Sequence, residues 1–185
     1  MSRLPFGITL LFGITLPTGT RSLDPAEIAV LTPVFGPSLD YGSIRISDAV
    51  GGAGRAYTVW IPFRGTVINI GPTAYQTPGA DPTLLIHEAT HCWQSQHHPN
   101  SAAYMANSLA SQAGAAAAGG SPYCYVPGKP FSAYGAEQIA KQVEHGVAEI
   151  VAHVREVAAG RWDSDNIRSL TVPRWEKPGD PDGTC

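Results

Sequence analysis

The segment Asp81-Pro-Thr-Leu-Leu-Ile-His-Glu-Ala-Thr-His-Cys-Trp-Gln-Ser-Gln-His97 holds the clearest pattern in the chain. It opens with an Asp-Pro pair, which is typical of a helix N-terminus. The His-Pro-Asn sequence at residues 98–100 cannot continue a helix, so we predict a helix from residue 82 to about residue 97. Within it, His87, Glu88 and His91 form the pattern His-Glu-x-x-His.

The spacing of these three side chains predicts a metal site. Residues four apart on a helix differ by about 40° in direction, so the imidazoles of His87 and His91 can bind one ion. Glu88 lies about 100° around the helix, where it can contact a water on that ion without being forced to bind the metal itself. The opposite face carries small and apolar residues, as expected of a helix that packs its back against a core.

A hydrolytic zinc site needs a third protein ligand and one open position. His97 stands at the spacing of the third histidine of a metzincin. That motif requires a turn-permitting glycine at the position of Gln94, however, and without it the helix should carry His97 to the wrong side.

A carboxylate from a later helix is the other solution, as in gluzincins, which use two histidines and one glutamate. The pattern alone does not choose among several residues. Glu137 and Glu149 each begin a Glu-x-x-Ala sequence, Glu144 shares a helix face with Glu137, and His145 could also bind metal.

Side chains near the motif suggest supporting roles. Ligand imidazoles need an acceptor for their other N–H group, and we expect Trp93 and Gln94 to serve packing and such hydrogen bonds. Cys92 lies on the apolar face, where a buried structural thiol is expected. Three tyrosines lie in segments that could border the cleft and donate to an oxyanion: Tyr123, Tyr125 and Tyr134.

The rest of the chain predicts an α+β domain. β-branched and aromatic residues predict three strands of a small antiparallel sheet, and caps, prolines and apolar periodicity predict further helices. The strands are 43–47, 57–61 and 66–70, with a short extended piece at 123–126. The helices are 25–31, which Pro33 ends, 102–118 and 132–159. We assign residues 1–22 to an N-terminal arm or edge strand, 23–160 to the domain and 161–185 to a polar tail.

Composition excludes several functions. The net charge of −3 gives no basic surface for nucleic acid. Cys92, Cys124 and Cys185 are too few for a disulfide framework, and no apolar run is long enough to span a membrane. The apolar stretch at residues 4–16 lacks a cleavage pattern, so we do not expect a signal peptide. We expect a cytoplasmic protein in the producing cell, with any export by a non-Sec route.

Three segments, residues 35–46, 84–97 and 134–140, resemble a group of bacterial zincin-like proteins whose genes often lie beside polymorphic-toxin or type VI secretion genes. The resemblance implies a zincin-like fold and assigns the third-ligand role to Glu137. The sequence departs from that group at Gly135 and Ile139, and Glu144-His145 replaces its usual acidic pair.

These observations together predict a zinc metallopeptidase. Zinc would be held by His87, His91 and Glu137, Glu88 would be the general base, and the substrate would be a peptide or protein. The alternative is a non-catalytic, zinc-stabilised adaptor of a secretion or toxin-delivery system. Such a structural site would bind zinc with four protein ligands and would not need a glutamate beside the first histidine.

Overall fold

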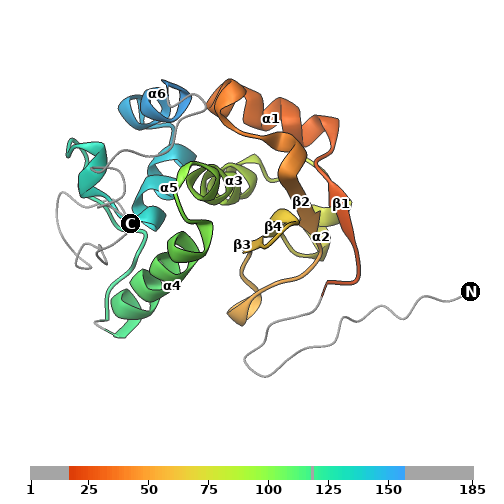
Figure 1. Ribbon diagram of the computed structural model, residues 1–185, viewed down its shortest axis with the longest axis horizontal. Helices are drawn as coiled ribbons and strands as arrows, with labels where there is room; N and C mark the ends of the chain where they lie inside the picture. Colours follow the sequence, from red (N-terminus) through yellow and green to blue (C-terminus); the bar gives the residue numbers. More distant parts are fainter. Residues whose placement is uncertain (1–16, 118, 157–185) are drawn as a thin grey trace, which may run out of the picture.

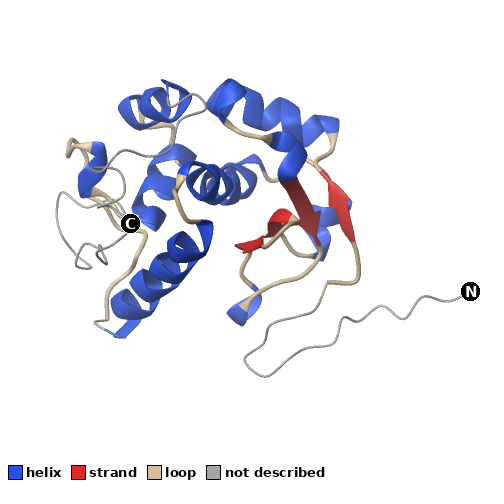
Figure 2. Ribbon diagram, in the orientation of Figure 1, coloured by secondary structure: helices blue, strands red, loops and turns tan. Residues whose placement is uncertain are grey.

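The computed structural model describes residues 17–117 and 119–156, in which a small sheet lies on one side of a central helix and most of the other helices surround its remaining sides (Figures 1 and 2). The strands are β1 (Thr20–Ser22), β2 (Ile44–Ser47), β3 (Tyr57–Ile61) and β4 (Gly65–Asn69). The helices are α1 (Pro25–Phe35), α2 (Pro72–Gln76), α3 (Pro82–His97), α4 (Ser101–Ala117), α5 (Ala136–Glu144) and α6 (Ala148–Glu156).

The sheet is mixed, with strand order β1-β2-β4-β3. β1 and β3 pair antiparallel with their neighbours, but β2 and β4 run parallel. The predicted all-antiparallel sheet is therefore wrong. The β3–β4 hairpin places β4 beside β2. The alternation of apolar and polar residues within one strand does not show which strands pair or in which direction. Gly65 has φ 83° where β4 meets β2, and a Cβ there would lie 2.3 Å from the carbonyl oxygen of Ser43.

The N-terminal helix is longer than predicted. Its start is as expected, because the Asp24 side chain accepts from the Ala26 N–H and the Glu27 carboxylate accepts from the Asp24 N–H. The prediction that Pro33 ends the helix at residue 31 is wrong, because the helix continues through Pro33 to Phe35. Leu31 and Phe35 lie one turn apart and are fully buried, and their packing keeps the last turn helical.

α3 confirms the helix predicted over 82–97. Asp81 Oδ1 accepts from the Leu84 N–H at 3.0 Å, as the N-cap pattern requires. Figure 1 shows α3 at the centre of the molecule, and it contacts α1, α4, α5 and the sheet. It is followed by α4, close to its predicted bounds.

The single long helix predicted over 132–159 is wrong. Residues 131–133 form a 3₁₀ turn, and α5 and α6 are separated at Gly146, which has φ 70°. The apolar periodicity continues across the break because both helices pack against one core. The extended piece predicted at 123–126 is also wrong, since this segment belongs to a turn with isolated bridge residues at 121 and 125.

Two parts of the predicted organisation lie outside the described residues. Within the predicted N-terminal arm or edge strand, residues 20–22 form β1 at the edge of the sheet beside β2. Residues 1–16 of that arm and the predicted tail 161–185 are not described. Among the described residues, no helix is both long enough and apolar enough to cross a membrane.

Candidate metal centre

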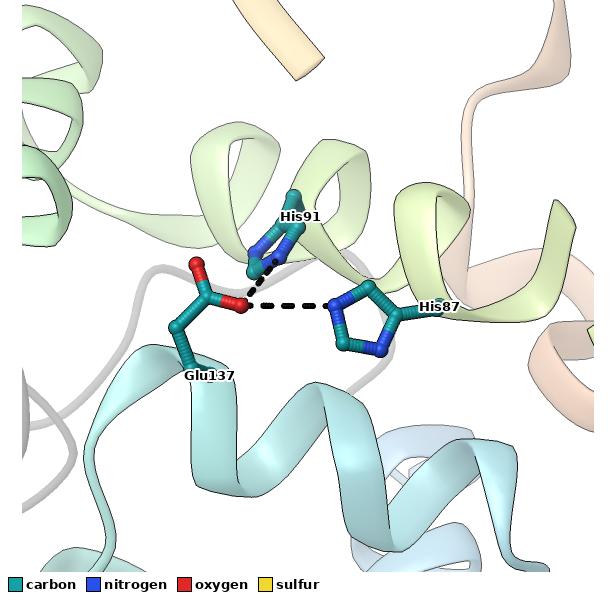
Figure 3. Close-up of side chains that lie close together, drawn as sticks. All are labelled: His87, His91 and Glu137. Atoms are coloured by element: carbon teal, nitrogen blue, oxygen red, sulfur yellow. Dashed lines mark hydrogen bonds and ion pairs between the residues drawn. The ribbon is translucent and has the colours of Figure 1, made fainter. Parts of the chain in front are cut away.

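Three side chains predicted as metal ligands converge between α3 and α5 (Figure 3). His87 and His91 project from one face of α3, and Glu137 projects from the first turn of α5. Glu137 Oε2 lies 3.3 Å from His87 Nε2 and 3.3 Å from His91 Nε2. All three residues are buried. The sequence placed two of them one helical turn apart, and the fold supplies the third.

The spacing of these atoms fits a tetrahedral zinc ion. Zinc binds histidine nitrogen and carboxylate oxygen at about 2.0–2.2 Å, which places neighbouring ligand atoms of a tetrahedron about 3.3–3.6 Å apart. The two separations of 3.3 Å match that edge. One ligand atom from each of the three residues lies within 4.8 Å of the others. The donor set of two imidazoles and one carboxylate is also that of known zinc hydrolases.

The protonation of His87 is set by a carboxylate behind it. His87 Nδ1 lies 2.9 Å from Glu144 Oε2, while Lys141 Nζ donates to Glu144 Oε1 at 2.6 Å. Burial would raise the pKa of Glu144, but these two partners lower it to about 2, so the group is an ionised acceptor at neutral pH. His87 therefore donates from Nδ1 to Glu144, and its Nε2 faces Glu137 as the ring nitrogen that a metal ion could bind.

An amide sets the protonation of His91 in the same way. Gln94 Nε2 donates to the Ala136 carbonyl at 3.0 Å, which fixes the orientation of the amide. Gln94 Oε1 then accepts from His91 Nδ1 at 2.9 Å and from the Tyr104 hydroxyl at 2.7 Å. The role expected for Gln94 is thus present in the structure, and the same side chain connects α3 to the start of α5.

Glu137 is oriented by a residue that the sequence analysis missed. Gln112 Nε2 of α4 donates to Glu137 Oε1 at 2.7 Å, which leaves Oε2 directed at the two imidazoles. Burial would raise the pKa of Glu137, but the charges and hydrogen bonds of His91 and His87 lower it far below its usual range. The α4 sequence is rich in alanine and small polar residues, and nothing in its pattern identifies Gln112 as a partner.

The two imidazoles carry the opposite shift. Burial alone would lower the pKa of His87, but hydrogen bonds to Glu137 and Glu144 outweigh it and raise the pKa to about 9. Burial also acts to lower the pKa of His91, which the charge of Glu137 raises instead. The carboxylates thus create a site that favours positive charge, whether it is carried by protons or by a cation.

Glu88 lies beside these residues, and a side chain of the sheet holds its carboxylate in place. The Thr58 hydroxyl of β3 lies 2.8 Å from Glu88 Oε2 and 3.2 Å from the Glu88 carbonyl oxygen. Burial raises the pKa of Glu88, although His91 and His87 act against the shift. A raised pKa brings a carboxylate closer to the range in which a general base works well. Sequence reasoning did not identify Thr58.

The other candidates for the third ligand lie elsewhere or have other partners. His97 Nδ1 lies 2.8 Å from the Trp93 carbonyl oxygen, and His145 Nδ1 lies 2.8 Å from the Tyr125 hydroxyl. Glu149 is exposed on α6. Glu144 contacts the other side of the His87 ring instead of joining the group.

The Glu144 contact leads to a prediction. Replacing Glu144 by alanine removes the acceptor of the His87 Nδ1–H group, so we expect the affinity of the site for a metal ion to fall about 10- to 100-fold. Glu144→Gln keeps an acceptor oxygen and should lose less, and Glu149→Ala on the exposed face of α6 should behave as wild type. Competition with a chromophoric chelator measures the affinities. Unchanged affinity in Glu144→Ala would show that this carboxylate does not position His87.

Comparison with known proteins gives one partial similarity. Over an alignment 94 positions long, the chain is 29% identical to the type VI secretion system spike protein VgrG2b of Pseudomonas aeruginosa PAO1. The match covers 43% of this chain and 8% of that protein, so the chain corresponds to a small part of its length. No family model matches the chain, and no solved structure matches it.

Proposed function

We propose that this chain is a zinc-dependent metallopeptidase that hydrolyses peptide bonds in a cleft beside His87, His91 and Glu137. The observation that carries the proposal is the position of Glu88, which lines the same cavity as a three-residue group with the spacing of a zinc site. Three protein ligands are the number that a hydrolytic zinc site uses, because the fourth position is kept for water or substrate.

The described residues divide the chemistry between two groups. A zinc ion held by His87, His91 and Glu137 would supply a Lewis acid, which acidifies water and polarises a carbonyl group. Glu88 takes the proton from the attacking water as the water oxygen bonds to the carbonyl carbon. It returns that proton to the leaving nitrogen as the carbon–nitrogen bond breaks, so that one water yields a carboxylic acid and an amine.

β3 provides a means of binding the substrate backbone. It is one of the two outer strands of the sheet, and its residues Tyr57, Thr58 and Val59 line the cavity that His87, His91 and Glu137 also line. An extended peptide can add to such an edge through main-chain hydrogen bonds. Thr58 then connects this strand to Glu88, so that the peptide and the base are positioned by the same element.

The alternative function, a zinc-stabilised adaptor, has less support. A structural site closes all four positions with protein ligands, whereas the group found among the described residues offers three. A buried glutamate beside the site is costly for a purely structural role. The partial similarity to a type VI secretion spike protein fits delivery of an enzyme by a non-Sec route, which we include in the proposal.

Metal removal tests the proposed function. We expect the purified chain to bind one zinc ion, to cleave an unfolded protein substrate, and to lose cleavage completely after dialysis against a chelator. Added zinc should restore it. Metal content is measured by atomic emission and cleavage by mass spectrometry. Cleavage that survives complete zinc removal would contradict the proposal, and so would a zinc-loaded chain that cleaves nothing.

A further inference from the structure

We infer that the cavity beside His87, His91 and Glu137 is a specificity pocket, which selects a large apolar side chain of the substrate next to the bond that is cleaved. The inference rests on the proposed peptidase function and adds the substrate class. It is carried by the lining of the cavity, by its continuity with the metal group, and by the apolar face of α4 at its edge.

The cavity has a volume of about 460 Å³ and lies between β3 and α4. Its lining includes His87, Glu88, His91 and Glu137, so the cavity and the candidate centre form one space. The remaining walls are largely apolar, and they include Val59 from β3 and Met105, Ala106 and Leu109 from α4.

Leu109 marks the rim of this pocket. Its side chain is 68% exposed, and Leu109 and Phe63 are the large hydrophobic residues exposed within the described part of the chain. Met105 lies one helical turn before Leu109 and is half-buried, so the two side chains form an apolar stripe along the opening. Exposed apolar surface at a cavity mouth favours an apolar ligand that covers it.

The position of the scissile bond decides what covers this surface. A carbonyl carbon that reacts beside Glu88 lies within two bonds of a substrate Cα atom on either side. This places an adjacent side chain within reach of the cavity that begins at His91 and Glu88. That space is walled by Val59 and Met105, so a leucine, methionine or phenylalanine side chain buries apolar surface there, whereas a charged side chain loses its hydration.

The other half of the cleft has a different character. A second cavity of about 520 Å³ shares His87, Glu88 and Tyr123 with the first, but it is lined by charged side chains of both signs. These are Arg55, Asp81, Lys141 and Glu144. The centre thus separates an apolar half from a charged half, and the apolar preference should apply to one side of the cleaved bond only.

Peptide cleavage and ligand binding together test the pocket. We expect digests of an unfolded protein to show a large apolar residue on one fixed side of the cleaved bonds. Alanine in place of leucine at that position should lower kcat/KM about 10-fold or more. In parallel, zinc-loaded Glu88→Gln protein should bind leucine hydroxamate about 10-fold more tightly than glycine hydroxamate by calorimetry.

Variants of Met105 and Leu109, the apolar stripe on α4, test whether these two residues cause the preference for apolar side chains. Leu109→Lys and Met105→Lys place an ammonium group in the opening, and each should reduce the preference for leucine over alanine about 10-fold. Leu109 is exposed, so its variant should fold even if the other does not. Phe63→Lys makes the same change at the other exposed hydrophobic residue and should leave the preference unchanged.

The outcomes distinguish the pocket from the reaction. If the hydroxamates show the apolar preference but no peptide is cleaved, the pocket is supported and the peptidase function is contradicted. If peptides are cleaved without preference for large apolar residues and the hydroxamates bind equally, the pocket is contradicted while the peptidase function stands. An unchanged preference in folded Leu109→Lys and Met105→Lys proteins also overturns the inference.

Discussion

Replacing Glu88 by glutamine is expected to abolish peptide cleavage while leaving zinc binding intact. Glutamine has the shape of the carboxylate and can still bond to Thr58, but it cannot accept the proton of the attacking water. General-base catalysis contributes about 10²- to 10⁴-fold, so kcat should fall by about three orders of magnitude with little change in KM. Steady-state cleavage of a fluorogenic peptide and metal analysis of the same sample measure both quantities.

Thr58→Val provides the matched comparison for this variant. It removes the hydroxyl that orients the Glu88 carboxylate but keeps the carboxylate itself. Its loss of kcat should be smaller than that of Glu88→Gln, and its zinc content should also be unchanged. A Glu88→Gln protein that retains zinc and cleaves at the wild-type rate would remove Glu88 from the mechanism.

The second large effect is expected at the third ligand. Glu137→Gln replaces a carboxylate that lies 3.3 Å from both imidazole nitrogens by a neutral amide, which is a far poorer ligand for zinc. We expect zinc affinity to fall more than about 100-fold, because loss of a direct ligand should cost more than loss of a residue behind one. Cleavage at limiting zinc should be lost with it.

Glu149→Gln is the control for that variant, because Glu149 begins the same Glu-x-x-Ala sequence but is exposed on α6. It should bind zinc as tightly as wild type. X-ray absorption at the zinc edge gives a second readout, since the wild-type centre should show two histidine ligands and one carboxylate. Equal zinc affinity in the Glu137 and Glu149 variants would mean that the third ligand lies elsewhere.

The sequence predicted the central helix well because its signals are local. The cap at Asp81, the proline after it and the stop near His98 are all short-range, and they define α3 to within a residue. The His-Glu-x-x-His spacing similarly required only helical geometry. Both features depend on interactions within one or two turns.

The features that sequence reasoning missed depend on tertiary structure. The parallel pairing of β2 with β4, the break at Gly146 and the contacts of Gln112 and Thr58 all depend on where distant segments meet. Glu137 could be separated from the competing carboxylates only by a family resemblance, because residue spacing alone fits Glu149 equally well. The fold brings α5, and not α6, against the motif face of α3.

The division of the three-residue group between α3 and α5 has a consequence for biosynthesis. A nascent chain that has left the ribosome only as far as α4 carries His87, Glu88 and His91 but lacks Glu137. Gln94 likewise has no Ala136 carbonyl to bond until α5 has been translated and has docked. The three-residue group is therefore incomplete until α5 has been translated and has packed against α3.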